Sequence, residues 1–162
     1  MKIRTVFCLI ILIAAAALPA CGGGGGGGSS APPTQADVFI AFDQPVTNLS
    51  GLDFRLNNAA GATFDSTTQP IAAVNAALGS LVVGNFDPAT NSNHIVLING
   101  GAAGFDTGTA PIIKVTYAIA AGAGNPTFSI ASAATFSAIA ANNAPTTPPV
   151  TAGNLLVTVT YR

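Results

Sequence analysis

The hydrophobic positions of this chain fall into short runs that are separated by turn-forming residues. Within 112–119 and again within 155–161, large apolar residues occupy every second position. This alternation predicts β-strands that bury one face. Seven further short apolar segments are predicted as strands: 38–42, 52–56, 62–64, 81–83, 94–98, 127–130 and 135–139. About nine strands, separated by turns at short intervals, predict an all-β fold of the β-sandwich class.

One segment departs from this pattern. Ile71, Val74 and Leu78 are spaced for one face of a helix, Pro70 suits a first helical turn, and Gly79 suits a helix stop. We therefore expect a helix of at most about two turns here.

The composition supports an all-β chain and excludes one class of partner. Lys, Glu and Arg, which usually cover the exposed faces of helices, are scarce, and charged residues make up only 7% of the chain. Of the five Lys and Arg residues, Lys2 and Arg4 lie at the N-terminus, which leaves three cations against six aspartates. Without a basic surface the chain lacks the electrostatic basis of nucleic-acid binding, so no nucleic-acid partner is expected.

The N-terminus has the order of a secretory signal. Lys2 and Arg4 precede an apolar stretch over 6–18. As a helix this stretch spans about 20 Å, which is short of the ~30 Å bilayer core, so it is interpreted as a signal peptide rather than a membrane-spanning helix.

The end of this signal resembles the lipobox of bacterial lipoproteins. Leu18-Pro19-Ala20-Cys21 has the branched apolar residue, the small residue and the cysteine of that motif, although Pro19 is not the usual choice. The resemblance implies that residues 1–20 are removed and that Cys21 is lipidated and anchors the chain to a membrane. Gly22, where an aspartate would suggest inner-membrane retention, favours the outer membrane of the cell envelope. The alternative is an ordinary cleaved signal in which the cysteine is incidental.

Residues 21–36 are predicted to be a disordered linker. Seven glycines, at 22–28, have no side chains that pack, and serine, alanine and proline follow them. A flexible coil of this length reaches roughly 20 Å on average. The chain thus divides into a signal peptide (1–20), a lipidated Gly-rich linker (21–36) and a β-sandwich domain (37–162).

The domain resembles a cohesin, a jelly-roll β-sandwich of the carbohydrate-binding-module-like superfamily. The segments that carry the resemblance are Asn48–Leu56 (NLSGLDFRL), Ala77–Val82 (ALGSLV), His94–Asn99 (HIVLIN) and Thr107–Tyr117 (TGTAPIIKVTY). Cohesins usually follow the first of these with a Tyr-Asp-Pro-like turn, whereas this chain has Asn57-Asn58-Ala59. The resemblance implies a module for protein–protein interaction or scaffolding whose usual partner is a dockerin.

The sequence contains no recognisable catalytic set, and the protein is predicted not to be an enzyme. His94 is the only histidine, and no Gly-x-Ser-x-Gly motif accompanies it. The six aspartates lie mostly beside Asn, Pro, Gly or Thr, where a carboxylate usually caps a turn.

Two candidate binding features remain. The oxygen-rich segment 85–93 suggests a calcium site in which Asp87 and Asn91 are ligands, joined by Asp106 if its loop lies alongside; the alternative is a turn that binds no metal. No other cofactor is expected. Phe105 is the candidate for an exposed ligand contact, of the kind that stacks on a polysaccharide, and the alternative is that it plugs its own loop.

Three functions are therefore open: a surface-anchored protein-binding module, a carbohydrate-binding module, or a structural envelope protein without a dedicated ligand. The last predicts that no large apolar or charged patch lies on either face of the sandwich.

Overall fold

The computed structural model describes residues 31–58, 60–64, 71–74, 80–99, 104–132, 137–141 and 144–162. Over these ranges the chain forms ten β-strands and no α-helix. The strands are β1 (Gln35–Phe42), β2 (Leu49–Asn58), β3 (Ala62–Thr63), β4 (Ile71–Ala73), β5 (Ser80–Asp87), β6 (Ser92–Asn99), β7 (Ile113–Ile119), β8 (Phe128–Ile130), β9 (Ser137–Ala140) and β10 (Leu155–Tyr161). One turn of 3-10 helix, Ala152–Asn154, precedes β10.

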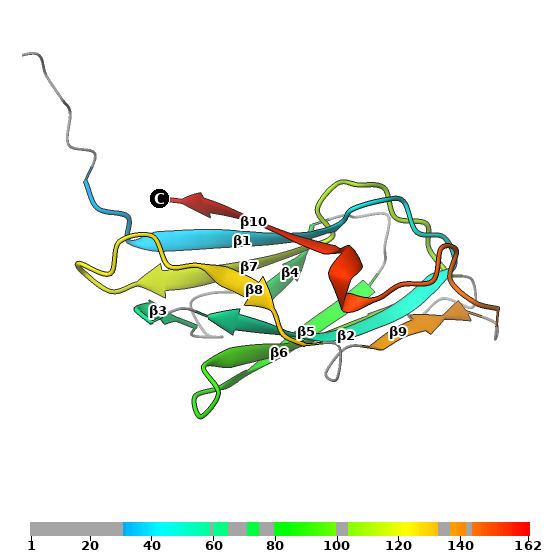
Figure 1. Ribbon diagram of the computed structural model, residues 1–162, viewed down its shortest axis with the longest axis horizontal. Coiled ribbons are helices and arrows are strands. Elements are labelled where there is room, and N and C mark those ends of the chain that lie inside the picture. The colour runs from blue at the N-terminus through cyan, green and yellow to red at the C-terminus, as the bar shows by residue number, and fades with distance from the viewer. Residues whose placement is uncertain are drawn as a thin grey trace, which may run out of the picture. The chain divides into compact units, whose positions relative to one another are not determined.

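The strands form two antiparallel sheets that pack face to face (Figure 1). In the first sheet the order is β10-β1-β7, and β3 and β4 pair with successive parts of the remaining edge of β7. In the second sheet the order is β5-β6-β2, and β8 and β9 divide the remaining edge of β2 in the same way. The predicted β-sandwich is confirmed, and each of the nine predicted segments overlaps one strand.

The tenth strand, β4, lies where a helix was predicted, so that prediction is wrong for residues 71–73. Ile71 pairs with Val115 and Ala73 pairs with Ile113 of β7. Pairing with a neighbouring strand outweighs the helix-like spacing of apolar residues, because β structure is decided by its partners more than by local preference. Pro70, Leu78 and Gly79 lie outside the described residues.

The first strand begins at Gln35, inside the range assigned to the linker, so the domain starts before residue 37. The amides of Thr34 and Gln35 donate to the carbonyl of Arg162 at 2.7 and 2.9 Å, and the amide of Ile119 donates to the carbonyl of Thr34 at 2.8 Å. The chain therefore enters the sandwich beside its own C-terminal residue.

The core lies between the two sheets and is built from the alternate, inward-facing residues of the strands. Its largest fully buried side chains are Val38, Ile40, Phe42, Leu49, Leu52, Phe54, Leu56, Ile95, Leu97, Ile112, Ile113 and Tyr117. All of them belong to the compact unit formed by residues 31–162. Because this unit contains the whole described core, a fragment of residues 31–162 has what it needs to fold alone.

Candidate functional site

The outer face of the second sheet is unusual because part of it is apolar. In β2 and β6 the inward residues are buried and, apart from Asn93, hydrophobic, so the alternate positions point outward. Strand register arranges these outward positions in rows across β9, β2, β6 and β5. The first row is Ile139, Gly51, Ile98 and Leu81, the second is Ser137, Asp53, Val96 and Val83, and the third holds Arg55, His94 and Asn85.

We call Leu81, Val83, Val96, Ile98 and Ile139 the outer-face patch. Leu81 is 61% exposed, Ile139 is 54% exposed, and Val83 and Ile98 are each 46% exposed. These four are among only six large hydrophobic side chains that are exposed in the described part of the chain. Because the patch spans strands that are paired in register, it is one continuous surface rather than scattered single residues.

Gly51 lets the patch continue across β2. A Cβ atom at Gly51 would stand 3.2 Å from Cδ1 of Ile139, closer than most real contacts. The side chain of Ile139 therefore lies over the backbone of Gly51 and fills the place that a side chain on β2 would take. As a result, the apolar surface runs from β9 to β5 without a polar side chain in the first row.

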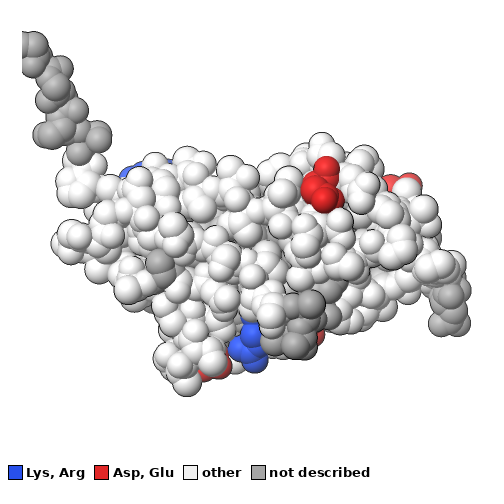
Figure 2. Space-filling view, viewed as in Figure 1, with Lys and Arg blue, Asp and Glu red and all other residues white. Residues whose placement is uncertain are grey.

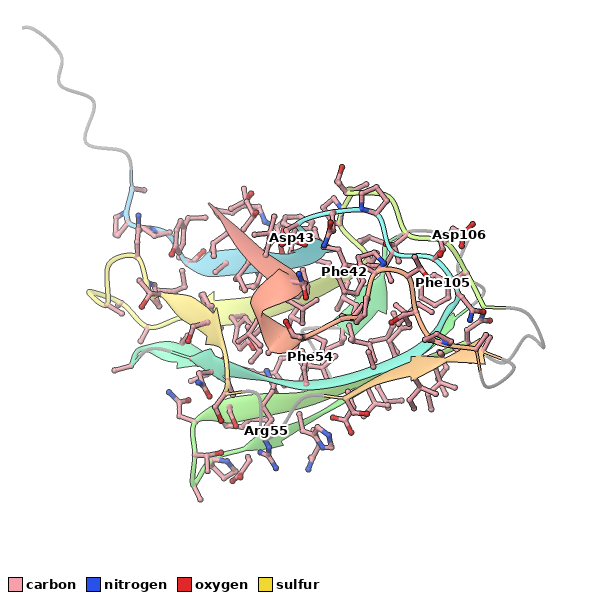
Figure 3. The ribbon with its side chains drawn as sticks, turned by 45° about the vertical axis from the view of Figure 1, so that its right-hand side comes forward. Phe42, Asp43, Phe54, Arg55, Phe105 and Asp106 are labelled. Atoms are coloured by element: carbon pink, nitrogen blue, oxygen red, sulfur yellow. The ribbon has the colours of Figure 1, made fainter. Side chains whose placement is uncertain are left out.

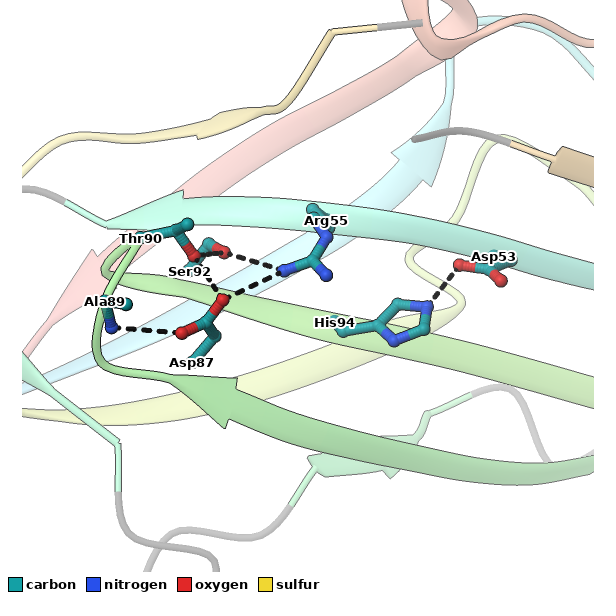
Figure 4. A network of polar contacts seen from close by, with 7 residues as sticks. All are labelled: Asp53, Arg55, Asp87, Ala89, Thr90, Ser92 and His94. Carbon is teal, nitrogen blue, oxygen red and sulfur yellow. Dashed lines mark hydrogen bonds and ion pairs between the residues drawn. The ribbon is translucent and has the colours of Figure 1, made fainter. Parts of the chain in front are cut away.

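Asp53 of the second row, the third row and the neighbouring hairpin form a polar border in which the side chains contact one another (Figure 4). His94 Nε2 lies 2.6 Å from Asp53 Oδ1, and Arg55 Nη1 lies 3.6 Å from Asp87 Oδ2. Arg55 also donates to the hydroxyl of Ser92 at 3.4 Å. These side chains are partnered within the chain, so the border presents few unpaired polar groups beside the patch.

The carboxylate of Asp87 forms hydrogen bonds within the turn that connects β5 and β6. Its carboxylate accepts hydrogen bonds from the Thr90 hydroxyl at 2.9 Å and from the Ala89 amide at 3.0 Å. The Thr90 hydrogen bond is the largest influence and, with the Ala89 amide and the charge of Arg55, it holds the pKa of Asp87 below its usual value. The carboxylate thus closes the β5–β6 hairpin, as aspartate commonly does in turns.

The three predicted calcium ligands are not brought together. Asp106 Oδ1 accepts a hydrogen bond from the backbone amide of Asn48, just before β2 begins, whereas Asn91 donates from its side chain to the carbonyl of Asn58, where β2 ends. At ~3.4 Å per residue, the length of β2 separates these points by roughly 30 Å. Figure 3 shows Asp106 and Arg55, the ion-pair partner of Asp87, far apart. Among the described residues, no group of three His, Cys, Asp or Glu side chains is placed to hold a metal ion.

Phe105 is a plug rather than an exposed contact. Only 7% of its surface is accessible, and it packs in the hydrophobic core. Its amide donates to the carbonyl of Leu49 at 2.8 Å, and its carbonyl accepts from the amide of Leu49 at 3.1 Å. Of the two predictions for this residue, the exposed ligand contact is wrong and the plug is correct.

The patch was not predicted from the sequence, although the sequence contains a pattern that indicates it. Leu81-Val82-Val83 and Ile95–Ile98 are apolar at consecutive positions rather than at alternate ones. Such a run places apolar residues on both faces of a strand, and in a two-layer sandwich one of those faces meets solvent.

Charged side chains are sparse on the face of the molecule that Figure 2 shows, which carries only isolated Lys, Arg and Asp side chains.

Cys21, the predicted lipidation site, lies outside the described residues. Within the described ranges no helix is long and apolar enough to cross a membrane. Comparison of the chain with protein-family models, with curated proteins and with solved structures gives no match.

Proposed function

We propose that this chain is a membrane-anchored lipoprotein of the cell envelope that presents a protein-binding β-sandwich, and that a partner protein docks on the outer-face patch. The observation that carries the proposal is the patch itself. A continuous apolar surface on a sheet that already has a filled core on its other side is a characteristic of interaction sites. Burying it against a partner gains roughly 25 cal/mol per Å² of apolar surface.

The charge and polarity of the outer-face patch indicate what kind of surface the partner presents. The patch is uncharged, and the neighbouring Asp53, Arg55, Asp87 and His94 are paired with one another. The partner therefore presents an uncharged, apolar surface, and long-range electrostatic steering contributes little to its recognition.

The position of the patch suits presentation from a tether. The chain enters β1 at the end of the sandwich where β2 finishes and the β5–β6 hairpin turns (Figure 1). The first row of the patch, at Gly51, lies toward the opposite end of β2. An anchor at Cys21 would thus hold the patch on the half of the domain that is remote from the point of attachment.

The two other functions receive less support. Carbohydrate binding usually needs an exposed aromatic side chain, and none of the large exposed hydrophobic residues of the described chain is aromatic. Tyr161 is half-buried, and its hydroxyl donates to the carbonyl of Pro126. A structural envelope protein without a ligand would have no reason to retain the outer-face patch.

The anchor is tested on the precursor. Replacing Cys21 with alanine is expected to abolish incorporation of an alkyne-labelled fatty acid and to move the protein out of the membrane fraction, because the only sulfur proposed to carry a lipid is lost. The matched control is Cys8→Ala, which removes a cysteine of the proposed signal peptide and is expected to label like the wild type. Labelling that persists in Cys21→Ala would contradict the anchor.

The docking face is tested with three single substitutions in the 31–162 fragment. Ile98→Lys and Ile139→Lys each place a charge in the patch, whereas Leu156→Lys alters a residue of similar exposure, 49%, on β10 of the other sheet. A protein captured from envelope extract by the wild-type fragment is expected to bind each patch variant at least about tenfold more weakly, and the Leu156 variant unchanged. Equal binding by all three variants, or no captured protein at all, would overturn the docking face.

A further inference from the structure

No other strand of the described chain pairs with the outer edge of β5. Strand β5 is eight residues long, and β6 is its only strand partner within the described chain. Edge strands of natural sheets normally carry lysine, proline or a bulge that discourages pairing with another chain. Between Ser80 and Phe86 this strand has no charged residue and no proline, and its pairing with β6 runs without a bulge.

Two outward side chains of β5 present an apolar surface beside this edge. Leu81 and Val83 point outward and are exposed, whereas Val82 faces the core. Beneath the strand, a Cβ atom at Gly84 would stand within 2 Å of Cδ1 of Ile71. The side chain of Ile71 therefore packs directly against Gly84 and supports β5 from the first sheet.

We propose that a second copy of this chain pairs with β5, edge to edge and antiparallel, about a two-fold axis at Val83. The segment is suited to its own copy because its seven uncharged residues bring no like charges opposite one another. A strand added here continues the second sheet by main-chain hydrogen bonds and extends the apolar face across the axis.

The register follows from the alternation of side chains. A two-fold axis perpendicular to the sheet keeps outward residues opposite outward residues only if it passes through a residue, not between two residues. An axis at Val83 pairs Val83 with its copy and Leu81 with Asn85, and leaves Asp87 outside the paired segment. An axis at Gly84 would instead place Leu81 opposite the Asp87 carboxylate. An axis at Val82 would shorten the paired segment.

The other long edge, that of β10, fits a second copy less well. It exposes one large hydrophobic residue, Leu156, against two on β5. The hydroxyl of Tyr161 ties the end of β10 to the carbonyl of Pro126, and Arg162 follows the strand immediately. Arginine at the end of an edge strand is the kind of charge that discourages further pairing.

The pairing does not depend on the proposed function, and it would enlarge the surface on which that function rests. Leu81 and Val83 belong to the outer-face patch, so two copies joined at β5 bring their patches side by side. A partner protein could still dock on the patch of a single copy at Ile98 and Ile139, which lie away from the axis.

Cysteine cross-linking tests the pairing because residues 31–162 contain no cysteine. In this fragment, Val83→Cys is expected to form a disulfide-linked dimer on mild oxidation roughly tenfold faster than Leu156→Cys, because paired thiols have a high effective concentration. Leu81→Cys and Asn85→Cys are expected to cross-link only when mixed, since each lies opposite the other. The wild-type fragment is expected to form a dimer at high concentration in sedimentation velocity.

Three results would overturn the proposal: a wild-type fragment that stays monomeric up to millimolar concentration, equal rates for Val83→Cys and Leu156→Cys, or self-linking of Leu81→Cys that is faster than that of Val83→Cys. Ile98→Lys and Ile139→Lys, introduced into Val83→Cys, separate this proposal from the docking face. They are expected to weaken partner capture, as they do in the wild-type fragment, and to leave the cross-linking rate unchanged.

Discussion

Replacing Gly104 with alanine is expected to lower the free energy of unfolding by about 2–3 kcal/mol. The loop residue Gly104 lies against the backbone of Asn48, just before β2. A Cβ atom at this position would stand 2.6 Å from the carbonyl carbon of Asn48 and 2.7 Å from its Cα. Because these are backbone atoms, no rotation of a side chain relieves the overlap, and either the loop or the start of β2 has to move.

Asn48 has little freedom to move. Its φ angle of 61° lies in the left-handed region, which asparagine tolerates better than most residues. Its side-chain amide donates to the carbonyl of Ala144 at 2.9 Å, and its backbone amide donates to Asp106 at 3.2 Å. A shift of Asn48 would strain these hydrogen bonds and those that join Leu49 to Phe105, so the cost of the added methyl group is not confined to one contact.

Gly108→Ala is the matched control, in the same loop. A Cβ atom at Gly108 meets nothing closer than 3.8 Å, so this substitution is expected to change stability by no more than about 0.5 kcal/mol. Urea unfolding of the 31–162 fragment measures both variants. Equal midpoints for Gly104→Ala and Gly108→Ala would show that Asn48 yields to the methyl group and that the close approach is not required.

The sequence predicted the strands well because most of them obey a local rule. Over 155–161 burial alternates with chain position, and over 113–119 it does so except at Thr116, which is buried. This alternation is visible in the sequence without knowledge of the partner strands. The fold class follows from such segments and from the scarcity of helix-forming charged residues.

What the sequence did not predict depends on residues far apart in the chain. Residues 71–73 form a strand because β7, more than 35 positions later, leaves an edge open to them. The outer-face patch likewise exists only through register: Leu81, Ile98 and Ile139 become neighbours when β5, β6, β2 and β9 are aligned. Asp87 and Asp106, which were predicted to share an ion if their loops lay side by side, are held at opposite ends of β2. Pairing across the sheet, rather than local composition, decided these outcomes.

Asp37→Asn is expected to cost about 2 kcal/mol of stability near neutral pH. Asp37 lies near the start of β1, and it is almost completely buried. Its carboxylate accepts hydrogen bonds from the Thr116 hydroxyl and the Arg162 guanidinium, each at 2.8 Å, and forms an ion pair with Lys114 at 3.3 Å. The variant keeps the shape of the side chain but removes the charge that all three groups share. In the variant, the side chains of Lys114 and Arg162 can turn to solvent, which limits the loss of stability.

The pH dependence of stability gives a second measurement of the same site. Burial acts to raise the pKa of Asp37, but the hydrogen bonds from Thr116 and Arg162 and the charge of Lys114 outweigh it and hold the pKa below its usual value. A carboxyl group whose pKa is lower in the folded state stabilises the fold above its unfolded pKa of about 3.9 and loses that effect as the pH falls through the folded value. The stability difference between wild type and Asp37→Asn is therefore expected to be constant from about pH 5 upward and to shrink below about pH 4.

Asp43→Asn separates this effect from the general acid sensitivity of the domain. Asp43 is exposed and accepts only long hydrogen bonds, of 3.3 and 3.4 Å, from the side chain of Asn154. The loss of this negative charge is expected to change the free energy of unfolding by no more than about 0.5 kcal/mol at neutral pH. Urea unfolding of the 31–162 fragment across the pH range compares the three proteins. If Asp37→Asn unfolds like Asp43→Asn at every pH, the contacts between Asp37, Thr116, Lys114 and Arg162 do not stabilise the first sheet.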